Sequence, residues 1–224
     1  MTFLQTNKLN YYYQDGESRR YILKDVDCNF EKGKFYSILG QSGSGKTTLL
    51  SLLCALDEPK SGEVIYQGED LKSIGYEKYR RNNVGMIFQS YNLVPYLTAV
   101  ENVRVAMSIT DNELPNDQLE VAYNLLDYIG ISREKADRLV NQLSGGEQQR
   151  IAIARALATN VELILADEPT GNLDEDMENE IVAIFQKLAH EHNKCVIMVT
   201  HSKEVAEQSD VMLSLRKGTI DLYE

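Results

Sequence analysis

The chain has 224 residues, a length that suits one domain or a core that carries one inserted subdomain. Of these residues 43% are hydrophobic and 25% are charged, as in an ordinary globular protein rather than a disordered one. Because 23 basic residues stand against 34 acidic ones, the net charge is −11, and we expect no nucleic-acid partner, since phosphate neutralisation needs a basic excess.

Cysteine usage and the start of the chain give no sign of secretion. Cys28, Cys54 and Cys195 lie far apart without a CxxC spacing, which indicates reduced core thiols and excludes a disulfide framework or a cysteine metal site. The first ten residues lack the basic-then-apolar pattern of a signal peptide. The longest uncharged run, 82–100, holds several amides and a proline, so we expect no membrane span.

Short strands and turns are expected first in chain order. Alternating side chains predict strands near 3–9 and 21–30, joined through the turn-forming residues QDGES. The apolar run 35–39 predicts a buried strand, which a glycine-rich turn connects to a helix at 47–56.

The middle of the chain changes to a helical period after a pair of strands expected at 62–67 and 84–88. Thr98-x-x-Glu101 is a capping-box pattern that predicts a helix at 100–107. A second helix is expected at 116–129, with Gly130 at its end. Its inner face is predicted to consist of Leu119, Tyr123, Leu126 and Ile129.

The last part of the chain alternates helices with buried strands. A helix is expected to run from Ser144 through Leu157, followed by apolar strands at 163–166 and 195–200. Between these strands lies a helix whose inner face is predicted to consist of Ile181, Ile184, Phe185 and Leu188. Strand–helix–strand repetition of this kind predicts an α/β fold with a parallel sheet and helices packed on it.

A phosphate cradle is predicted at 40–47, where GQSGSGKT fits the pattern GxxxxGK[ST] between an apolar strand and a helix. Glycines allow consecutive backbone N–H groups to point inward, and the helix N-terminus adds partial positive charge. Lys46 would contact the β- and γ-phosphates of a nucleotide, and Thr47 would hold Mg²⁺. The predicted phosphate contacts are Gly40, Gln41, Ser42, Gly43, Ser44, Gly45, Lys46, Thr47 and Thr48.

Two carboxylates follow the apolar strand at 163–166. Ligands of open α/β sheets gather at the carboxyl ends of the strands, so Asp167 and Glu168 can reach the cradle. Asp167 fits the role of a Mg²⁺ partner, and Glu168 fits the role of a general base toward water. The plainer alternative is a pair of surface acids in a turn before Pro169.

At 143–150 the sequence reads LSGGEQQR, and here the chain resembles the ATP-binding cassette (ABC) family, the nucleotide-binding subunits of membrane transporters. We call 143–150 the signature segment. The family's parts follow in the family's order: an upstream aromatic, the cradle, Gln89, the signature segment, the acidic pair, the GNLD loop and His201. Three stretches, FQSYNLVPYLT, EQQRIAIARAL and ADEPTGNLD, resemble the MacB/LolD/FtsE-like group.

The resemblance implies a P-loop NTPase (RecA-like) parallel-sheet core with an N-terminal antiparallel β-subdomain and an inserted α-helical subdomain. The whole chain, 1–224, would be a single ABC ATPase domain. Its β-subdomain and nucleotide-binding core would comprise 1–88 and 150–224, and its helical subdomain, with the signature segment, would comprise 89–149.

The resemblance also implies roles for residues outside the cradle. Ser144, Gly145 and Gly146 would bind the γ-phosphate held by a second copy, although Ser144-x-x-Glu147 is equally a helix-capping box. His201 would contact the γ-phosphate and orient Glu168 and water. Gln89 would sense Mg²⁺ and the attacking water and take part in catalysis.

Two of the assigned roles have an alternative. Tyr13 is the better candidate to stack on adenine, and Tyr11, two residues away on the same strand face, is the alternative. Asp174 resembles the aspartate that signals across the dimer, and the alternative is a helix cap. These roles belong to residues that the resemblance carries over one by one.

The function implied is an ATP-binding and ATP-hydrolysing subunit, with ATP and Mg²⁺ as cofactors, that drives a separately encoded integral membrane permease. Binding of ATP would produce a head-to-tail homodimer on the cytoplasmic face of the plasma membrane. The implied transport is export or extraction of a peptide, lipoprotein or drug-like substrate. The alternative is a regulatory ATPase that transmits force or a signal to a permease-like partner, in cell division or antimicrobial-peptide sensing.

Overall fold

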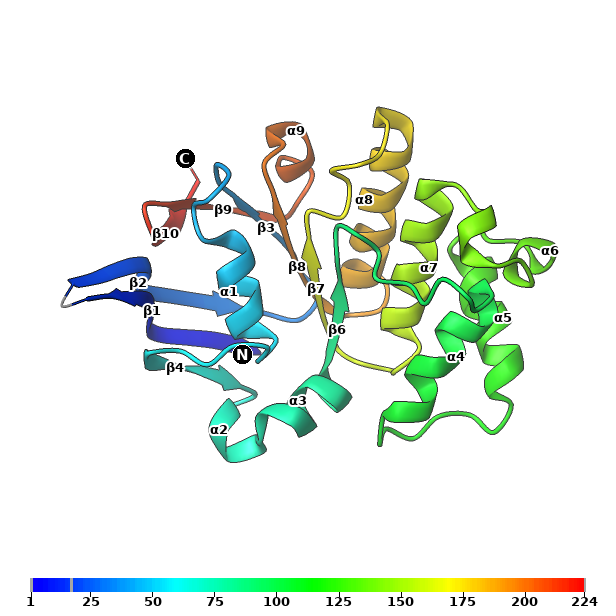
Figure 1. The fold of residues 1–224 in the computed structure, drawn as a ribbon, viewed down its shortest axis with the longest axis horizontal. Helices are drawn as coiled ribbons and strands as arrows, with labels where there is room; N and C mark the ends of the chain where they lie inside the picture. The colour runs from blue at the N-terminus through cyan, green and yellow to red at the C-terminus, as the bar shows by residue number, and fades with distance from the viewer. Residues whose placement is uncertain (1, 17, 224) are drawn as a thin grey trace.

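The structure is a computed structural model that describes residues 2–16 and 18–223. Figure 1 shows two sheets with helices between and beside them. The strands are β1 Leu4–Asp15, β2 Ser18–Phe30, β3 Phe35–Leu39, β4 Ser61–Tyr66, β5 Glu69–Asp70, β6 Val84–Ile87, β7 Leu163–Asp167, β8 Cys195–Thr200, β9 Val211–Arg216 and β10 Thr219–Leu222. The helices are α1 Lys46–Leu53, α2 Leu71–Ile74, α3 Tyr76–Asn83, α4 Ala99–Ile109, α5 Gln118–Tyr128, α6 Arg133–Ala136, the 3-10 turn η1 Val140–Gln142, α7 Gly145–Leu157, α8 Glu175–His190 and α9 Lys203–Ala206.

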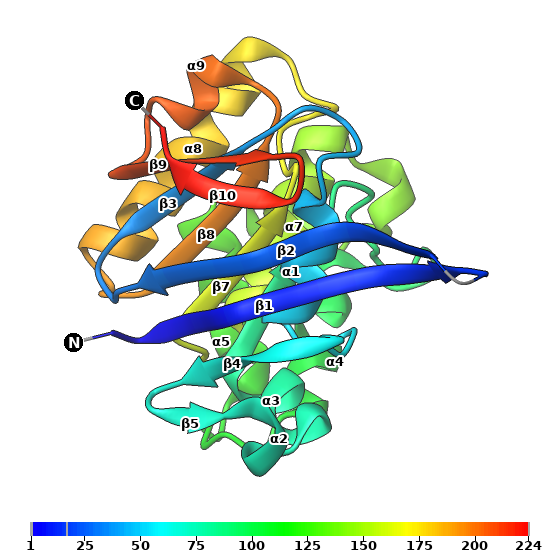
Figure 2. The same cartoon turned by 90° about the vertical axis from the view of Figure 1, so that its left-hand side faces the viewer.

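The first part of the chain forms an antiparallel sheet in the order β2-β1-β4-β5 (Figure 2). Its inner face buries Leu4, Leu9 and Leu23, while alternate side chains remain exposed, as expected for a sheet covered on one face. The predicted N-terminal antiparallel sheet is therefore confirmed.

The core sheet has the order β10-β9-β3-β8-β7-β6, and its strands are parallel except for β10, which runs antiparallel to β9. In β7 the side chains alternate between the two faces: Leu163 and Leu165 belong to one hydrophobic cluster and Ile164 to the other. Because both faces are buried, the strand sequences are nearly continuous apolar runs, which confirms the predicted parallel α/β core.

The two sheets and their helices are stacked in layers. Figure 1 shows α1 between the antiparallel sheet and the core sheet, with α8 and α7 on the opposite side of the core strands. One hydrophobic cluster fills the space around α1, including Leu49, Leu50 and Leu53. The other lies beneath α4, α5, α7 and α8 and includes Phe185. The cradle helix is thus fixed from both sides.

Helices α4 to α7 pack together beside the core, and two of them begin at capping boxes predicted from the sequence. Thr98 and Glu101 cap α4 reciprocally, as Ser144 and Glu147 cap α7. Helix α7 continues through residue 150 without a break. The division of the chain into 89–149 and the rest stays a prediction.

Three details differ from the expectations. The segments 62–67 and 84–88 form strands, but they do not pair, because β4 pairs with β1 and β5 while β6 pairs with β7. The helix expected at 47–56 ends at Leu53, because Ala55 adopts a left-handed φ of 58°. On α5, Leu126 is buried but Leu119 is 42% exposed, so the inner face is narrower than predicted.

The cysteines and the helix lengths agree with the expectations. All three cysteines are free and buried, and burial raises the pKa of Cys28 and Cys195 to about 12, which keeps the thiols protonated. Within 2–16 and 18–223, no helix combines the length and the apolar character needed to cross a bilayer.

Replacing Gly62 by alanine should destabilise the protein by about 2–5 kcal/mol, because a left-handed backbone costs a side chain about 1–2 kcal/mol and overpacking adds about 1–3 kcal/mol. Gly62 has φ of +78°, and a Cβ there would lie 2.2 Å from the carbonyl oxygen of Lys8 in β1. Urea unfolding measures the loss. Gly68→Ala is the matched control, since Gly68 has φ of +86° and open space around its Cβ position. Equal losses in both variants would contradict the role of the close approach to β1.

Candidate nucleotide-binding and catalytic site

Three segments of the predicted site meet because three parallel strands end together. In the core sheet Leu39 of β3 lies opposite Thr200 of β8, and Asp167 of β7 lies opposite Val199. The next residues along the chain are the cradle, Glu168 and His201. Sheet register therefore brings together residues as far apart in sequence as Gly40 and His201.

The cradle has the backbone that its glycines permit. Gly43 and Gly45 have φ of +76° and +105°, a region that side chains rarely occupy. A Cβ on Gly40 would lie 2.5 Å from the hydroxyl oxygen of Ser44, so the loop closes tightly there. That hydroxyl is buried, and it has no hydrogen-bond partner among the described residues. An anion bound in the loop would supply the acceptor that it needs.

Lys46 is the buried cation of the site, with only 5% of its surface exposed. Its Nζ donates to the carbonyl oxygens of Gly40 at 2.8 Å and Gln41 at 3.2 Å. Nζ also lies 3.3 Å from Oε1 of Glu168. The ammonium group thus faces the interior of the cradle, where a phosphate would compete for it.

Asp167 and Thr47 present oxygen atoms to each other across the end of β7. Alternation places Asp167 on the face of Leu163 and Leu165, which is the face that α1 covers. The hydroxyl of Thr47 donates to Oδ1 of Asp167 at 3.3 Å. Burial raises the pKa of the Asp167 carboxyl. A hydroxyl and a carboxylate in this arrangement are the oxygen ligands that Mg²⁺ takes, so the residues present fit that cation.

Glu168 connects the cradle to His201. Its Oε2 lies 3.1 Å from Nδ1 of His201, while Oε1 faces Lys46. Glu168 adopts a left-handed φ of 45°, and its N–H donates to the carbonyl of Val199 at 3.1 Å, which fixes the turn after β7. The carboxylate is therefore aimed at the cradle rather than at solvent, unlike a surface acid in a turn.

Gln89 follows β6 and lies against the loop after Glu168. Its amide nitrogen is 3.0 Å from the point that a Cβ on Gly171 would occupy, and its carbonyl accepts from the side chain of Asn172 at 3.4 Å. Gln89 is exposed, so its side chain is free to reach a ligand at the end of β7.

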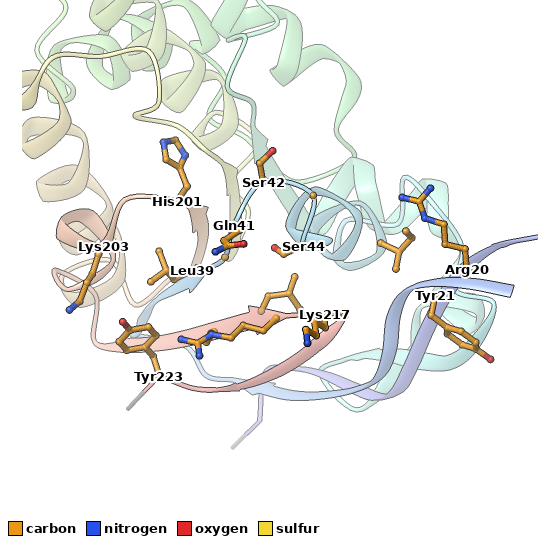
Figure 3. A pocket seen from close by; sticks show the side chains of 17 residues that line it. Arg20, Tyr21, Leu39, Gln41, Ser42, Ser44, His201, Lys203, Lys217 and Tyr223 are labelled. Atoms are coloured by element: carbon orange, nitrogen blue, oxygen red, sulfur yellow. The ribbon is translucent and has the colours of Figure 1, made fainter.

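An open cavity of about 980 Å³ lies beside the cradle. Figure 3 shows Gln41 and Ser44 in its middle, Arg20 and Tyr21 on one side, and Lys203 and Tyr223 on the other. Its lining includes four basic side chains and, among the described residues, no carboxylate. These basic residues, which the sequence analysis did not single out, are Arg20, Lys203, Arg216 and Lys217.

No short motif connects those four residues, because they come from β2, α9 and the β9–β10 hairpin. Hydrogen bonding joins the hairpin to β2, where the N–H of Lys24 donates to the carbonyl of Gly218 at 2.8 Å. The sequence therefore indicated this basic lining only through short runs of basic residues in an otherwise acidic chain. Their arrangement attracts anions to the cavity.

The two candidate tyrosines differ in exposure. Tyr13 is 57% exposed, whereas Tyr11 is 9% exposed and packs edge-on against the Tyr13 ring at 5.6 Å. Only Tyr13 offers a free ring face of the kind that stacking needs.

Ser144 and Asp174 both cap helices. Ser144 and Gly145 are exposed at the start of α7, and Figure 1 shows this end of the helix well apart from α1. Gly146 is buried, and a Cβ there would lie 2.3 Å from Cε of Met177. Asp174 caps α8, since its Oδ1 accepts from the N–H of Met177 at 3.0 Å. Within one chain, the signature segment therefore stands away from the cradle.

Comparisons with known proteins agree with this arrangement. Residues 23–171 match the family model described as ABC transporter. The chain is 45% identical to the uncharacterised ABC transporter ATP-binding protein YclH of Bacillus subtilis, over 100% of this chain and 98% of that protein. It is 38% identical to the lipoprotein-releasing system ATP-binding protein LolD of Rickettsia bellii, over 98% of this chain and 97% of that protein.

Among solved structures, the ATP-binding cassette MJ0796 of Methanocaldococcus jannaschii was captured as a dimer in a post-hydrolysis state bound to ADP and Pi. It matches with a TM-score of 0.89 and 36% identity, over 99% of this chain and 98% of that one. The ABC resemblance inferred from the signature segment is thereby confirmed. The chain belongs to the ABC transporter family, in which it is an ATP-binding subunit with ATPase activity, close to the LolD type.

Proposed function

We propose that this chain hydrolyses ATP at a composite site of a head-to-tail homodimer and thereby drives a separate membrane permease. The observation that supports it most directly is the convergence of Lys46, Glu168 and His201 at the mouth of the cradle. A cation for the phosphates, a carboxylate for water and an imidazole beside that carboxylate make up the polar groups that phosphoryl transfer to water uses.

The proposed steps begin with a change of partner at Lys46. The γ-phosphate draws the ammonium away from the Gly40 and Gln41 carbonyls and releases Glu168 from its ion pair. Glu168, oriented by His201, then accepts a proton from the attacking water, whose oxygen bonds to the γ-phosphorus as the bond from that phosphorus to the β,γ-bridging oxygen breaks, leaving ADP and phosphate. Mg²⁺, held by Thr47 and Asp167 and sensed by Gln89, would neutralise charge on the phosphates. Tyr13 would stack on the adenine ring.

The second half of the composite site would come from another copy. Exposed N–H groups at the start of α7 attract an anion, and Ser144 adds a hydroxyl there. Because Ser144 stands away from its own cradle, a γ-phosphate in one copy would meet Ser144, Gly145 and Gly146 of the other. Asp174, besides capping α8, would signal across the dimer. The dimeric MJ0796 cassette supports this proposal.

We place the permease contact at the segment 89–97, between the core and helices α4 to α7. Tyr96 is 78% exposed there, the largest exposed fraction among the described exposed hydrophobic residues, whereas Leu93 is partly buried against the core. Docking would hold the chain at the cytoplasmic face of the membrane. The LolD relative favours extraction or export of a lipoprotein, peptide or drug-like molecule over a purely regulatory role.

Replacing Glu168 by glutamine should lower ATP turnover at least about 100-fold, because a general base contributes about 10²–10⁴-fold to rate. ATP binding should persist, and ATP should then hold two chains together, which light scattering after gel filtration measures. Glu191→Gln, the same carboxylate-to-amide change at an exposed residue at the end of α8, should hydrolyse ATP normally and stay unpaired. Unchanged turnover in the Glu168 variant would remove the assignment of Glu168 as the base.

Replacing Asp167 by asparagine should raise the Mg²⁺ concentration for half-maximal hydrolysis at least about 10-fold, since a ligand charge is lost. The affinity for ATP without Mg²⁺, measured by the thermal stabilisation that ATP causes, should change by less than about twofold. In the unmodified chain, protonation of Asp167 as pH falls should raise the Mg²⁺ concentration needed for half-maximal hydrolysis. Because the pKa of Asp167 is raised, this increase should begin at a higher pH than it would for an ordinary aspartate. The control Asp176→Asn should leave the Mg²⁺ requirement unchanged. If Asp167→Asn also leaves it unchanged, the assignment of Asp167 as a Mg²⁺ ligand is contradicted.

Replacing Tyr96 by aspartate should abolish co-purification with an integral membrane protein and leave ATP binding by the free chain unchanged, because a buried unpaired carboxylate at a contact is costly. Mass spectrometry of the membrane pull-down identifies the partner. Tyr128→Asp, at a site 43% exposed on α5, is the control. Full recovery of the same membrane protein with the Tyr96 variant would rule out docking through this segment.

A further inference from the structure

Arg155 in α7 holds a segment of chain that is distant in sequence. Its guanidinium donates to the carbonyl oxygen of Tyr91 at 2.8 Å and to that of Asn92 at 2.5 Å. A planar fork with parallel N–H groups suits two neighbouring acceptors, which a lysine ammonium cannot match. We call residues 89–92 the Gln89 loop.

The Gln89 loop is strained where Arg155 binds it. Tyr91 and Asn92 have left-handed φ angles of 61° and 50°. Side chains at such angles persist only where the surrounding structure holds them. The two carbonyls that accept from Arg155 belong to these same two residues, so the guanidinium holds the strained turn together with the hydrogen bond from the Tyr91 N–H to the Phe88 carbonyl.

The guanidinium of Arg155 forms no ion pair within the described residues. Among residues 2–16 and 18–223, no carboxylate pairs with Arg155, whereas Arg150 on the same helix pairs with Glu180 at 2.5 Å. Burial lowers the pKa of the Arg155 guanidinium. Among the described residues, the carbonyls of Tyr91 and Asn92 are therefore the groups that compensate this desolvated charge.

The loop touches both halves of the proposed composite site. At one end the Gln89 amide packs against Gly171, whose N–H donates to the Glu168 carbonyl at 3.2 Å. At the other, the hydroxyl oxygen of Tyr91 lies 3.0 Å from the point that a Cβ on Gly145 would occupy. The hydroxyl end of the Tyr91 side chain thus lies beside Gly145, in the exposed first turn of α7 next to Ser144.

We propose that Arg155 is a positioning residue for ATP-driven pairing: by fixing the Gln89 loop it holds the Tyr91 ring against Gly145 and so sets the start of α7 for the γ-phosphate of the second copy. The inference rests on the proposed function, since pairing is the step that it tunes. It assigns Arg155 no contact with the nucleotide, and the contact of Tyr91 with Gly145 that it uses lies within one chain and needs no permease.

The experiment uses the full chain in the Glu168→Gln background, without a permease. Arg155→Met should raise the concentration of protein needed for half-maximal ATP-driven pairing at least about 10-fold, while the affinity of the single chain for ATP changes less than about twofold. Arg155→Lys, which keeps the charge but cannot form the fork, should need a protein concentration for pairing between those of the Glu168→Gln background and of Arg155→Met. The control Arg133→Met removes an exposed cation on α6 and should pair normally.

Tyr91→Ala separates transmission from folding, because its main-chain carbonyl still accepts from Arg155. It should weaken pairing as much as Arg155→Met, and the double variant should be no weaker than the weaker single one, since both act through one contact. Should Arg155→Met fail to fold, Tyr91→Ala still decides. Normal pairing by Tyr91→Ala, or additive losses in the double variant, would overturn the proposal. If Glu168→Gln alone never pairs with ATP, the proposed function fails instead.

Discussion

The site depends on one buried cation. The ammonium group of Lys46 is almost fully enclosed, and its partners are two carbonyls of its own loop and one carboxylate. A buried charge needs compensation, and the carbonyls with Glu168 supply it here. A triphosphate would offer more charge at the same place, so in the proposed mechanism its entry exchanges one set of partners for another. The proposal thus couples the position of Glu168 to whether the cradle holds phosphate.

The core sheet makes that coupling possible, because parallel strands in register deliver their successors to one edge. Leu39, Asp167 and Thr200 end three strands side by side. The period of two along β7 turns Asp167 toward α1 and Thr47. Glu168, one residue later and in a left-handed turn, faces the cradle instead. Two adjacent carboxylates thus reach two different partners, Thr47 and Lys46, from the end of one strand.

Sequence patterns predicted the local features well, and long-range pairings poorly. The cradle, the buried strands and the capping boxes at Thr98 and Ser144 depend on residues within a few positions of each other, so spacing alone reveals them. The pairing of β4 with β1 depends on register across more than 50 residues, and no local pattern states it. The contact of Arg155 with the Tyr91 carbonyl was equally hidden, since a backbone acceptor leaves no mark in the sequence. The basic lining of the cavity, from separate elements, escaped for the same reason.

Charge links the site to the proposed pairing. The chain carries −11 overall, yet the cavity beside its cradle is lined by Arg20, Lys203, Arg216 and Lys217. An acidic exterior with a basic cavity concentrates nucleotide at the cradle while it makes two copies repel each other. Screening limits that repulsion to about 8–10 Å at physiological salt, so it acts mainly at close approach. Pairing then requires a ligand that both copies share at contact distance. In the proposed dimer, a γ-phosphate between Lys46 of one copy and the start of α7 of the other would satisfy that requirement, and its removal by hydrolysis would restore the repulsion.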